Sequence, residues 1–212
     1  MFNLAKIHKM GIIHCDIKPQ NFLVGKGEKE NIIFLIDYGL SKRYRDEQTR
    51  IHISYKDNKS LTGTARFASR NAHNGIEQTR RDDLESLGYV FLYFLKGSLP
   101  WQGLKIKEKT EKYQKIREMK NSVSAKDLFK GYPDEFIQYM EYCFNLKFEE
   151  EPNYRNMINM FKELFKNRDY ENDLAYDWVT VKSNDKVLKD ASICQSDEYE
   201  KAENQINNSK YF

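Results

Sequence analysis

Residues 12–23 read IIHCDIKPQNFL, and this short stretch combines an apolar lead, a His-Cys-Asp cluster, a Lys-Pro pair and an Asn. Asp16 and Asn21 stand five residues apart within it. Phosphoryl transfer needs a carboxylate that accepts the proton of the attacking hydroxyl, and oxygen ligands that hold magnesium on the nucleotide phosphates. The stretch therefore has the composition of a catalytic loop.

A second carboxylate follows a short apolar run, in IIFLIDYGL at residues 32–40. In protein kinases the base and one metal ligand belong to the pattern H-R-D-x-x-x-x-N, and a second metal-binding Asp begins D-F-G. Asp37 takes this second position, and Lys18 would lie beside the transferring phosphoryl group. Each pattern alone is common, but their spacing and their apolar lead-ins agree. We therefore predict a kinase-type site with ATP and Mg²⁺ as cofactors.

Composition limits the class of protein. The 212 residues are 40% hydrophobic and 14% aromatic, which favours one packed globular domain. A net charge of +3 does not indicate nucleic acid as the main partner. Three cysteines without CxxC spacing indicate neither a disulfide framework nor a zinc site. No run approaches about 18 apolar residues, so we expect no membrane partner and an intracellular monomer, cytoplasmic and/or nuclear.

Hydrophobic periodicity predicts a mainly α fold with a short β-hairpin. Residues 1–10 are expected to form a helix that ends at Gly11. The runs at 22–24 and 32–36 are expected to pair as a hairpin, while residues 41–81 show no clear period. Four later helices are expected: a buried one at 82–97, a charged one within 104–120, and amphipathic ones around 136–144, entered through Pro133, and 154–165. We expect a domain over 1–180 and a polar, disordered tail over 181–212.

Longer motifs make the resemblance specific. They are HCDIKPQNFLVG, LIDYGLSKRYRD, LTGTARFAS, NGIEQTRRDDLESLGYVFLYFLKGSLPWQGLK, GYPDEF and the late YDW. Together they resemble the casein kinase I family of Ser/Thr protein kinases, from about residue 1 to about residue 180. The stretch FASRN resembles the S-I-N variant that this family has in place of A-P-E.

The resemblance implies a role for each matching residue. Asp16 would be the catalytic base, Lys18 the phosphate-contacting lysine, and Thr64 the residue that orients the base. Asn21 and Asp37 would be the magnesium ligands. Asp83 would brace the catalytic loop, and Arg66 and Lys112 would bind anions near the substrate. The implied substrates are proteins with acidic or phosphorylated Ser/Thr contexts.

Cys15 is the main departure from the kinase pattern, because most kinases have Arg there. A thiol cannot replace the charge-assisted bonds of a guanidinium, each worth roughly 1.5–3 kcal/mol. An activation segment ordered by phosphorylation through this position is therefore not expected. Tyr38, in place of the usual Phe, adds a hydroxyl that needs a partner if buried. A Cys-His nucleophile at His14 and Cys15 is an alternative, but adjacent residues seldom face each other and no orienting third group is evident.

A complete kinase also has a Gly-rich loop, a strand lysine and a helix glutamate, and none of these precedes residue 12. The only G-x-G, Gly25 to Gly27, fits a hairpin turn better than a nucleotide loop. We therefore expect a C-terminal kinase lobe without its small lobe, and weak or no nucleotide binding by the chain alone. An inactive pseudokinase scaffold remains an alternative. A plain helical interaction domain does not explain the spacing of Asp16, Asn21 and Asp37.

Overall fold

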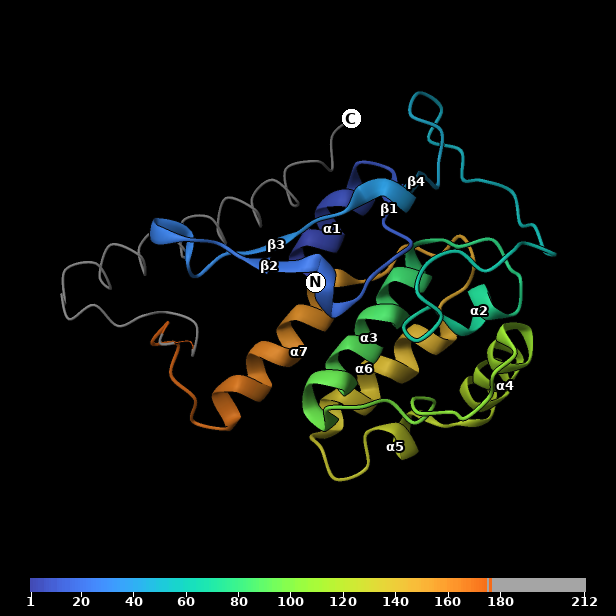
Figure 1. The fold of residues 1–212 in the computed structure, drawn as a ribbon. Coiled ribbons are helices and arrows are strands. Elements are labelled where there is room, and N and C mark those ends of the chain that lie inside the picture. The colour runs from blue at the N-terminus through green and yellow to red at the C-terminus, as the bar shows by residue number, and fades with distance from the viewer. Residues whose placement is uncertain (175, 177–212) are drawn as a thin grey trace. The chain divides into compact units, whose positions relative to one another are not determined.

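Residues 1–174 and 176 are described in the computed structural model of the protein (Figure 1). They form two units: one made of Met1–Phe22 and Leu35–Asp169, and another that contains Leu23–Phe34 and the described residues from Tyr170 on. The first unit contains every site residue named above. The predicted tail at 181–212 and the end of the YDW motif lie outside the described residues.

The described chain is mostly helical, as predicted from periodicity. Its helices are α1 Phe2–Lys9, α2 Arg70–His73, α3 Arg80–Lys96, α4 Lys109–Ser122, α5 Ala125–Leu128, α6 Asp134–Asn145 and α7 Tyr154–Asn167. Its strands are β1 Ile12–Ile13, β2 Phe22–Val24, β3 Ile33–Leu35 and β4 Lys42–Arg43. Among the described residues, no helix combines the length and apolarity needed to cross a membrane.

The described residues form two separate strand pairs. The predicted hairpin forms between β2 and β3, with a 3₁₀ turn at Gly27–Lys29 between them. The second pair was not predicted: β1 runs antiparallel to β4, with Ile12 opposite Arg43. Each strand of this pair has only two residues, too few for any period to be read from the sequence.

Helix α3 begins at Arg80, two residues before the predicted start at Asp82. The reason is the cap: Asp82 Oδ2 accepts a hydrogen bond from the N–H of Thr79 at 2.7 Å. The C-terminus is as predicted, because Gly97 has φ +75°, a conformation that glycine adopts without a Cβ penalty. Asp82 is fully buried, and burial raises its pKa to about 6.

Helix α4 also differs from its prediction, since it begins at Lys109 and not near residue 104. Glu108 caps it by accepting the N–H of Glu111 at 2.6 Å. The two short helices α2 and α5 were missed, because four residues are too few for a period. The start of α2 shows a recognisable signal in hindsight, since the Ser69 side chain accepts the N–H of Ala72.

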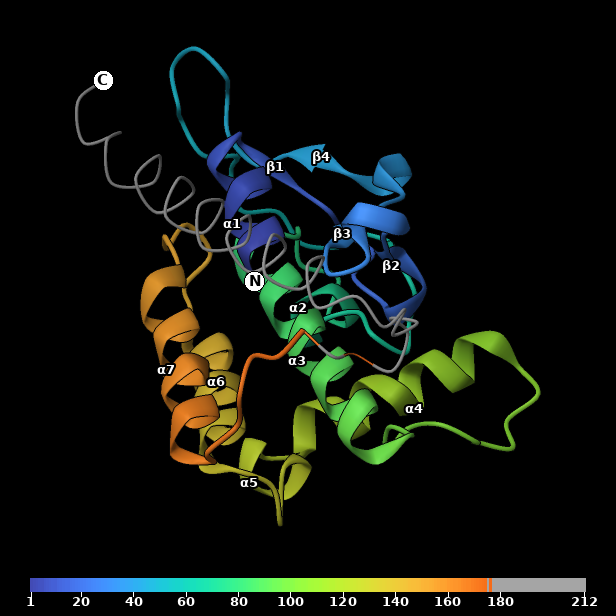
Figure 2. The same cartoon turned by 90° about the vertical axis from the view of Figure 1, so that its left-hand side faces the viewer.

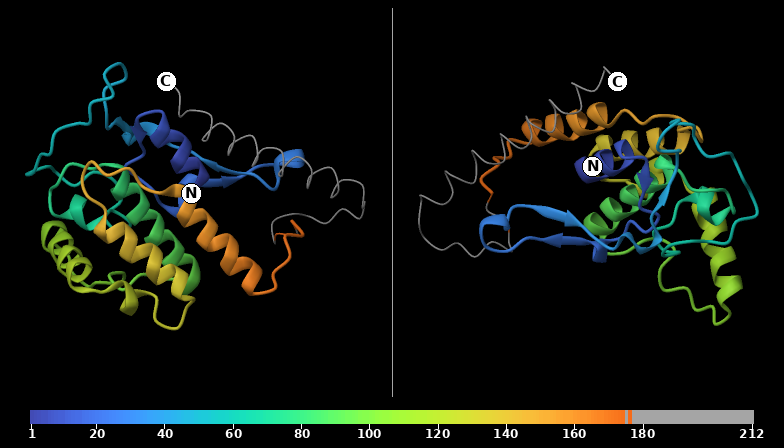
Figure 3. Two further views of the ribbon diagram at one scale, coloured as in Figure 1. Left: turned by 180° about the vertical axis from the view of Figure 1, so that it is seen from behind. Right: turned by 90° about the horizontal axis from the view of Figure 1, so that it is seen from above.

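The main hydrophobic core lies between α3, α6 and α7, which run side by side (Figures 1 and 3). Aromatic rings from all three helices meet there: Phe91 lies 5.4 Å from Tyr139 and 5.6 Å from Phe161, measured between ring centroids. Helices α4 and α5 lie toward the other end of α3 from β1 and β4 (Figure 2). The segment that carries Asp16 thus lies at one end of the helical body.

Close approach of α3 and α6 requires a glycine at position 88. A Cβ there would lie 2.5 Å from Met140 Sδ and 3.2 Å from Tyr139 Cε1, and both of these residues are fully buried. We predict that Gly88→Val lowers the free energy of unfolding by about 2 kcal/mol, because overpacked cores lose roughly 1–3 kcal/mol. Urea denaturation measures this, with Glu163→Val on the exposed face of α7 as control. Equal stabilities of the two variants would contradict the tight approach.

Candidate active site

The catalytic loop is fixed by a single buried carboxylate. After β1 the chain turns at Cys15, whose φ is +66°, a conformation that costs a non-glycine residue roughly 1 kcal/mol. Asp83 of α3 holds this turn: its Oδ2 accepts the N–H of His14 at 2.6 Å, and its Oδ1 accepts the N–H of Cys15 at 2.9 Å. Because both bonds go to the backbone, they set the direction in which the next residue, Asp16, leaves the turn.

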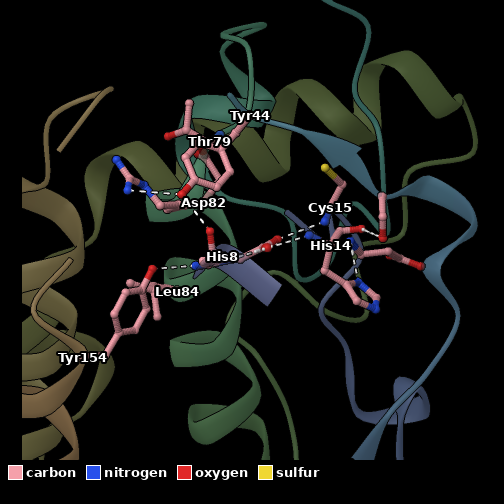
Figure 4. Close-up of polar contacts among 12 residues, drawn as sticks. His8, His14, Cys15, Tyr44, Thr79, Asp82, Leu84 and Tyr154 are labelled. Atoms are coloured by element: carbon pink, nitrogen blue, oxygen red, sulfur yellow. Dashed lines mark hydrogen bonds and ion pairs between the residues drawn. The ribbon is translucent and has the colours of Figure 1, made fainter. Parts of the chain in front are cut away.

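Asp83 is itself held by a chain of side chains from α1 and α7. His8 Nε2 donates to Asp83 Oδ2 at 2.9 Å, and in the neutral ring Nδ1 accepts the hydroxyl of Tyr154 at 2.6 Å. Figure 4 shows His8 between Tyr154 and the backbone of His14 and Cys15. All of these groups are buried or nearly so, and burial raises the pKa of Tyr154. This series of hydrogen bonds thus connects the helical core to the turn before Asp16.

His14 connects the two halves of the site. Its Nδ1 accepts the N–H of Asp16 at 3.3 Å, so Nε2 carries the proton and donates to the carbonyl of Ile36 at 2.9 Å. Ile36 immediately precedes Asp37, and its own N–H donates to the carbonyl of Asn21 at 2.9 Å. The fully buried imidazole therefore fixes the spacing between the loop that carries Asp16 and the segment that carries Asp37.

Asp16 is oriented and kept ionised by two neighbours. Its Oδ1 accepts the backbone N–H of Thr64 at 2.8 Å and the Thr64 hydroxyl at 2.7 Å, while its Oδ2 pairs with the ammonium of Lys18. Burial acts to raise the pKa of Asp16, but the hydrogen bonds from Lys18 and Thr64 outweigh it and hold the pKa below its ordinary value of 3.8. An ionised carboxylate with one face held in this way is suited to accept a proton.

Gly63 allows Thr64 to reach Asp16. Its φ is +91°, and a Cβ on it would lie 2.4 Å from the carbonyl oxygen of Cys15. Only glycine has both the conformational freedom and the space that this approach needs. Nothing in the sequence marks Gly63 as a site residue, although it stands in the LTGTARFAS motif.

Asn21 and Asp37 present the kind of ligands that Mg²⁺ prefers. The Asn21 amide nitrogen donates to the carbonyl of Asp16 at 2.9 Å, which leaves the amide oxygen for a metal ion. Asp37 has φ +64° at the start of the 3₁₀ turn Tyr38–Leu40, and its carboxylate is exposed. Mg²⁺ usually takes one or two carboxylates together with substrate phosphates. The residues fit such an ion, and within the described part of the chain no group of three His, Cys, Asp or Glu forms a separate metal cage.

Arg66 and Lys112, the two predicted anion ligands, lie on different segments of the structure. The Arg66 guanidinium lies over the rings of Phe67 and Tyr93, with its carbon 5.1 and 5.9 Å from the ring centroids. Lys112 lies on α4, where its backbone N–H donates to the carbonyl of Glu108. Both side chains are half-buried. Arg66 stands two residues after Thr64, whose N–H and hydroxyl both bind Asp16.

The surroundings of Cys15 oppose the nucleophile alternative. Burial and the charge of Asp83 raise the pKa of the Cys15 thiol, which keeps it protonated. Both ring nitrogens of His14 are already engaged, as described above. Tyr38, the second departure, is 45% exposed, so its hydroxyl can reach water. The kinase-type arrangement is thus the one that the geometry favours.

An internal carboxylate occupies the neighbourhood where the missing arginine would act. Glu77 pairs with Lys42 and with Lys59, the latter at 3.2 Å, and these residues line a small cavity together with Cys15. Burial acts to raise the pKa of Glu77, but bonds from the two lysines outweigh it and lower the pKa. Ion pairs therefore connect the segments that carry Lys42, Lys59 and Glu77.

Several residues that build the site could not be found in the sequence. His8 and Asp83 are 75 residues apart, and Tyr154 lies a further 71 residues along the chain. Nothing in the local pattern of α1 marks His8 as different from a polar residue on the helix surface. Lys120 is fully buried, although it stands in a segment where charged residues are frequent and nothing in the local pattern sets it apart.

A comparison with protein-family models identifies the family. Residues 2–164 match the protein kinase domain, which is more than half of the chain. The chain therefore belongs to the protein kinase family, whose members generally use ATP and Mg²⁺.

Removal of the Thr64 hydroxyl should raise the pKa of Asp16, because one hydrogen bond to the ionised form is lost. We expect Thr64→Val to raise it by about one unit or less, measured by NMR titration of the carboxyl group. The folded pKa lies below the unfolded value, so ionised Asp16 stabilises the folded chain above that value, and this stabilisation is lost as the pH falls through the folded pKa. In the variant the folded pKa should lie closer to the unfolded pKa, so the pH interval over which this stabilisation is lost should be narrower. An unchanged pKa would contradict the assigned contact.

Loss of charge at Asp83 should weaken the whole unit. We expect Asp83→Asn to lower the free energy of unfolding by about 2–3 kcal/mol, because bonds to a buried charged acceptor contribute roughly 1.5–3 kcal/mol. Urea denaturation gives the value, with Asp57→Asn in the exposed loop as the matched control. A loss no larger than that of the control would show that the turn at Cys15 does not depend on the carboxylate.

Proposed function

We propose that the protein is a Ser/Thr protein kinase of the casein kinase I type, corresponding to the C-terminal lobe of such an enzyme. Family membership supports the kinase class. The observation that supports the chemistry is the environment of Asp16, an ionised carboxylate whose one oxygen is bound by Thr64 and whose other oxygen pairs with Lys18. The casein kinase I type is inferred from the long motifs, of which LTGTARFAS includes both Gly63 and Thr64.

Each residue has a role in this proposal. Asp16 accepts the proton of the substrate hydroxyl, and Lys18, which is close enough to pair with Asp16, neutralises charge that develops on the transferred group. Asn21 and Asp37 supply oxygens that hold Mg²⁺. Bound ATP supplies the γ-phosphoryl group. Thr64 keeps the base in one orientation, which favours proton transfer without reorganisation of the site.

The proposed substrates are proteins whose Ser or Thr stands among acidic or phosphorylated residues. Arg66 supports this, because its guanidinium lies against two aromatic rings near the Thr64 segment and not in an ion pair with a carboxylate among the described residues. Lys112 would supply a second cation from α4. Arg is well suited to bind phosphate and carboxylate through paired hydrogen bonds.

Removal of the base tests the function. In a Mg-ATP assay of a complete version of the enzyme, one that includes a small lobe, with casein and with an acidic Ser peptide, we expect Asp16→Asn to reduce phosphate transfer by about two to four orders of magnitude, the range found for general bases. Asp134→Asn, an exposed carboxylate on α6, is the matched control and should retain activity. A peptide with its acidic residues replaced by neutral ones should be the poorer substrate.

The outcomes separate the proposed enzyme from a binding module. Phosphate transfer by the complete enzyme that persists in the Asp16→Asn variant would contradict the role of the base. No transfer at all, together with binding of the acidic peptide, would indicate an inactive scaffold. Equal transfer to the acidic and the neutral peptide would refute the proposed substrate preference while leaving the kinase activity in place.

A further inference from the structure

Residues 64–68 form an irregular turn whose carbonyls are bound by side chains from elsewhere in the chain. Two N–H groups of the turn, those of Phe67 and Ala68, donate to the carbonyl of Thr64 at 2.8 and 2.9 Å. Three other carbonyls belong to no helix or strand ladder, those of Ala65, Arg66 and Ala68. Buried carbonyls are almost always paired, so donors from outside the turn are needed.

Lys120 of α4 supplies two of these bonds. Its ammonium donates to the carbonyl of Ala65 at 3.1 Å and to the carbonyl of Ala68. The side chain has no exposed surface, and its nitrogen lies 4.6 Å from the ring centroid of Tyr89 and 4.8 Å from that of Trp101. A buried ammonium is expensive unless it is bound in this way, so its position beneath the turn is specific.

Two further donors come from other elements. The indole N–H of Trp101 donates to the carbonyl of Arg66 at 2.7 Å, and Nε2 of His73 donates to the carbonyl of Ala65 at 2.8 Å. Burial and the charge of Lys120 lower the pKa of His73 to about 4, so this imidazole is neutral near pH 7. Three carbonyls of one short turn are therefore held by α2, α4 and the loop after α3.

The turn matters because of the residues that it carries. Thr64 at its start donates twice to Asp16, and Arg66 in its middle is the candidate anion ligand. A shift of the turn would move both of these groups at once. A turn without its own secondary structure cannot resist such a shift through local hydrogen bonds alone.

We propose that Lys120, Trp101 and His73 form a carbonyl clamp that holds the turn at residues 64–68 against the base. Lys120 is thereby a positioning residue for phosphoryl transfer, acting on Asp16 through Thr64. This last part rests on the proposed function, whereas the clamp itself does not. Lysine suits the position because its ammonium has three donors, of which two are used on the carbonyls.

Burial also changes the protonation equilibrium of Lys120. Burial lowers the pKa of Lys120 to about 7, and the charge of Glu85 opposes this effect. Glu85 is in turn bound by the hydroxyl of Tyr89 and the N–H of Arg70, both at 2.7 Å. The ammonium of Lys120 thus lies in the field of a buried acid that is itself hydrogen-bonded.

Amide exchange of the full chain tests the clamp directly. Lys120→Met keeps most of the length of the side chain and removes its donors. We expect the Thr64 N–H to exchange about tenfold faster in this variant, while core amides of α6 change by about twofold or less. Lys115→Met, on the exposed face of the same helix, is the matched control and should leave Thr64 exchange unchanged. Unchanged Thr64 exchange in a folded Lys120→Met variant would overturn the proposal.

Two further results separate positioning from general stability. Equal acceleration of exchange throughout the unit would overturn the proposal, because it would show that Lys120 supports the fold as a whole. In the Mg-ATP assay, Lys120→Met should lower kcat about tenfold with KM for ATP unchanged, and a loss confined to KM would count against it. If the complete enzyme transfers no phosphate, the proposed function fails, but the exchange data still decide the clamp.

A second variant covers the case in which Lys120→Met does not fold. Trp101→Phe keeps an aromatic ring in the core and removes only the donor to the carbonyl of Arg66. We expect Thr64 exchange to rise by about threefold, a smaller effect because one donor is lost and two side chains of the clamp remain. No change in a folded Trp101→Phe variant, with Lys120→Met unfolded, would overturn the proposal.

Discussion

The carboxylate of Asp83 is the group on which the site depends. It accepts hydrogen bonds from two consecutive backbone N–H groups and from His8, so three donors meet one buried charge. Such a charge is costly to bury unless it is fully bound, and full binding is possible only if Cys15 adopts its left-handed conformation. The energetic requirement of one acid on α3 therefore sets the backbone geometry in front of Asp16.

The first turns of α3 act as an organising centre for more than the catalytic loop. Asp82 accepts from Thr79 and from the hydroxyl of Ser69, and Glu85 accepts from the N–H of Arg70. Three buried acids on one helix end thus bind three different segments, namely the turn at His14 and Cys15, the start of α2 and the entry of α3 itself. These segments have little secondary structure of their own, so the buried acids provide the order that a sheet or a longer helix would otherwise supply.

Two irregular stretches of backbone lie beside Asp16, the proposed base, and both are fixed by side chains from other elements. On one side Asp83 holds N–H groups, and on the other Lys120, Trp101 and His73 hold carbonyls. In both cases side chains fix an irregular stretch of backbone: an acceptor binds its N–H groups on one side, and donors bind its carbonyls on the other. An active-site loop can then be exposed to its ligands while its backbone keeps a single geometry.

The sequence alone determined what depends on short-range patterns. Hydrophobic period and the Gly97 stop revealed most of the helices, the hairpin was visible as two β-rich runs, and the spacing of Asp16, Asn21 and Asp37 indicated the kinase-type site. In the described residues, the errors lay in helix boundaries, shifted by two to five residues, and in elements of two to four residues, which are too short to show a period. The roles of His8, Tyr154 and Lys120 were decided only by tertiary structure. Their meaning depends on donors and acceptors that lie many residues away, and a charged or polar residue in a helix looks the same in the sequence whether folding buries it or leaves it in water.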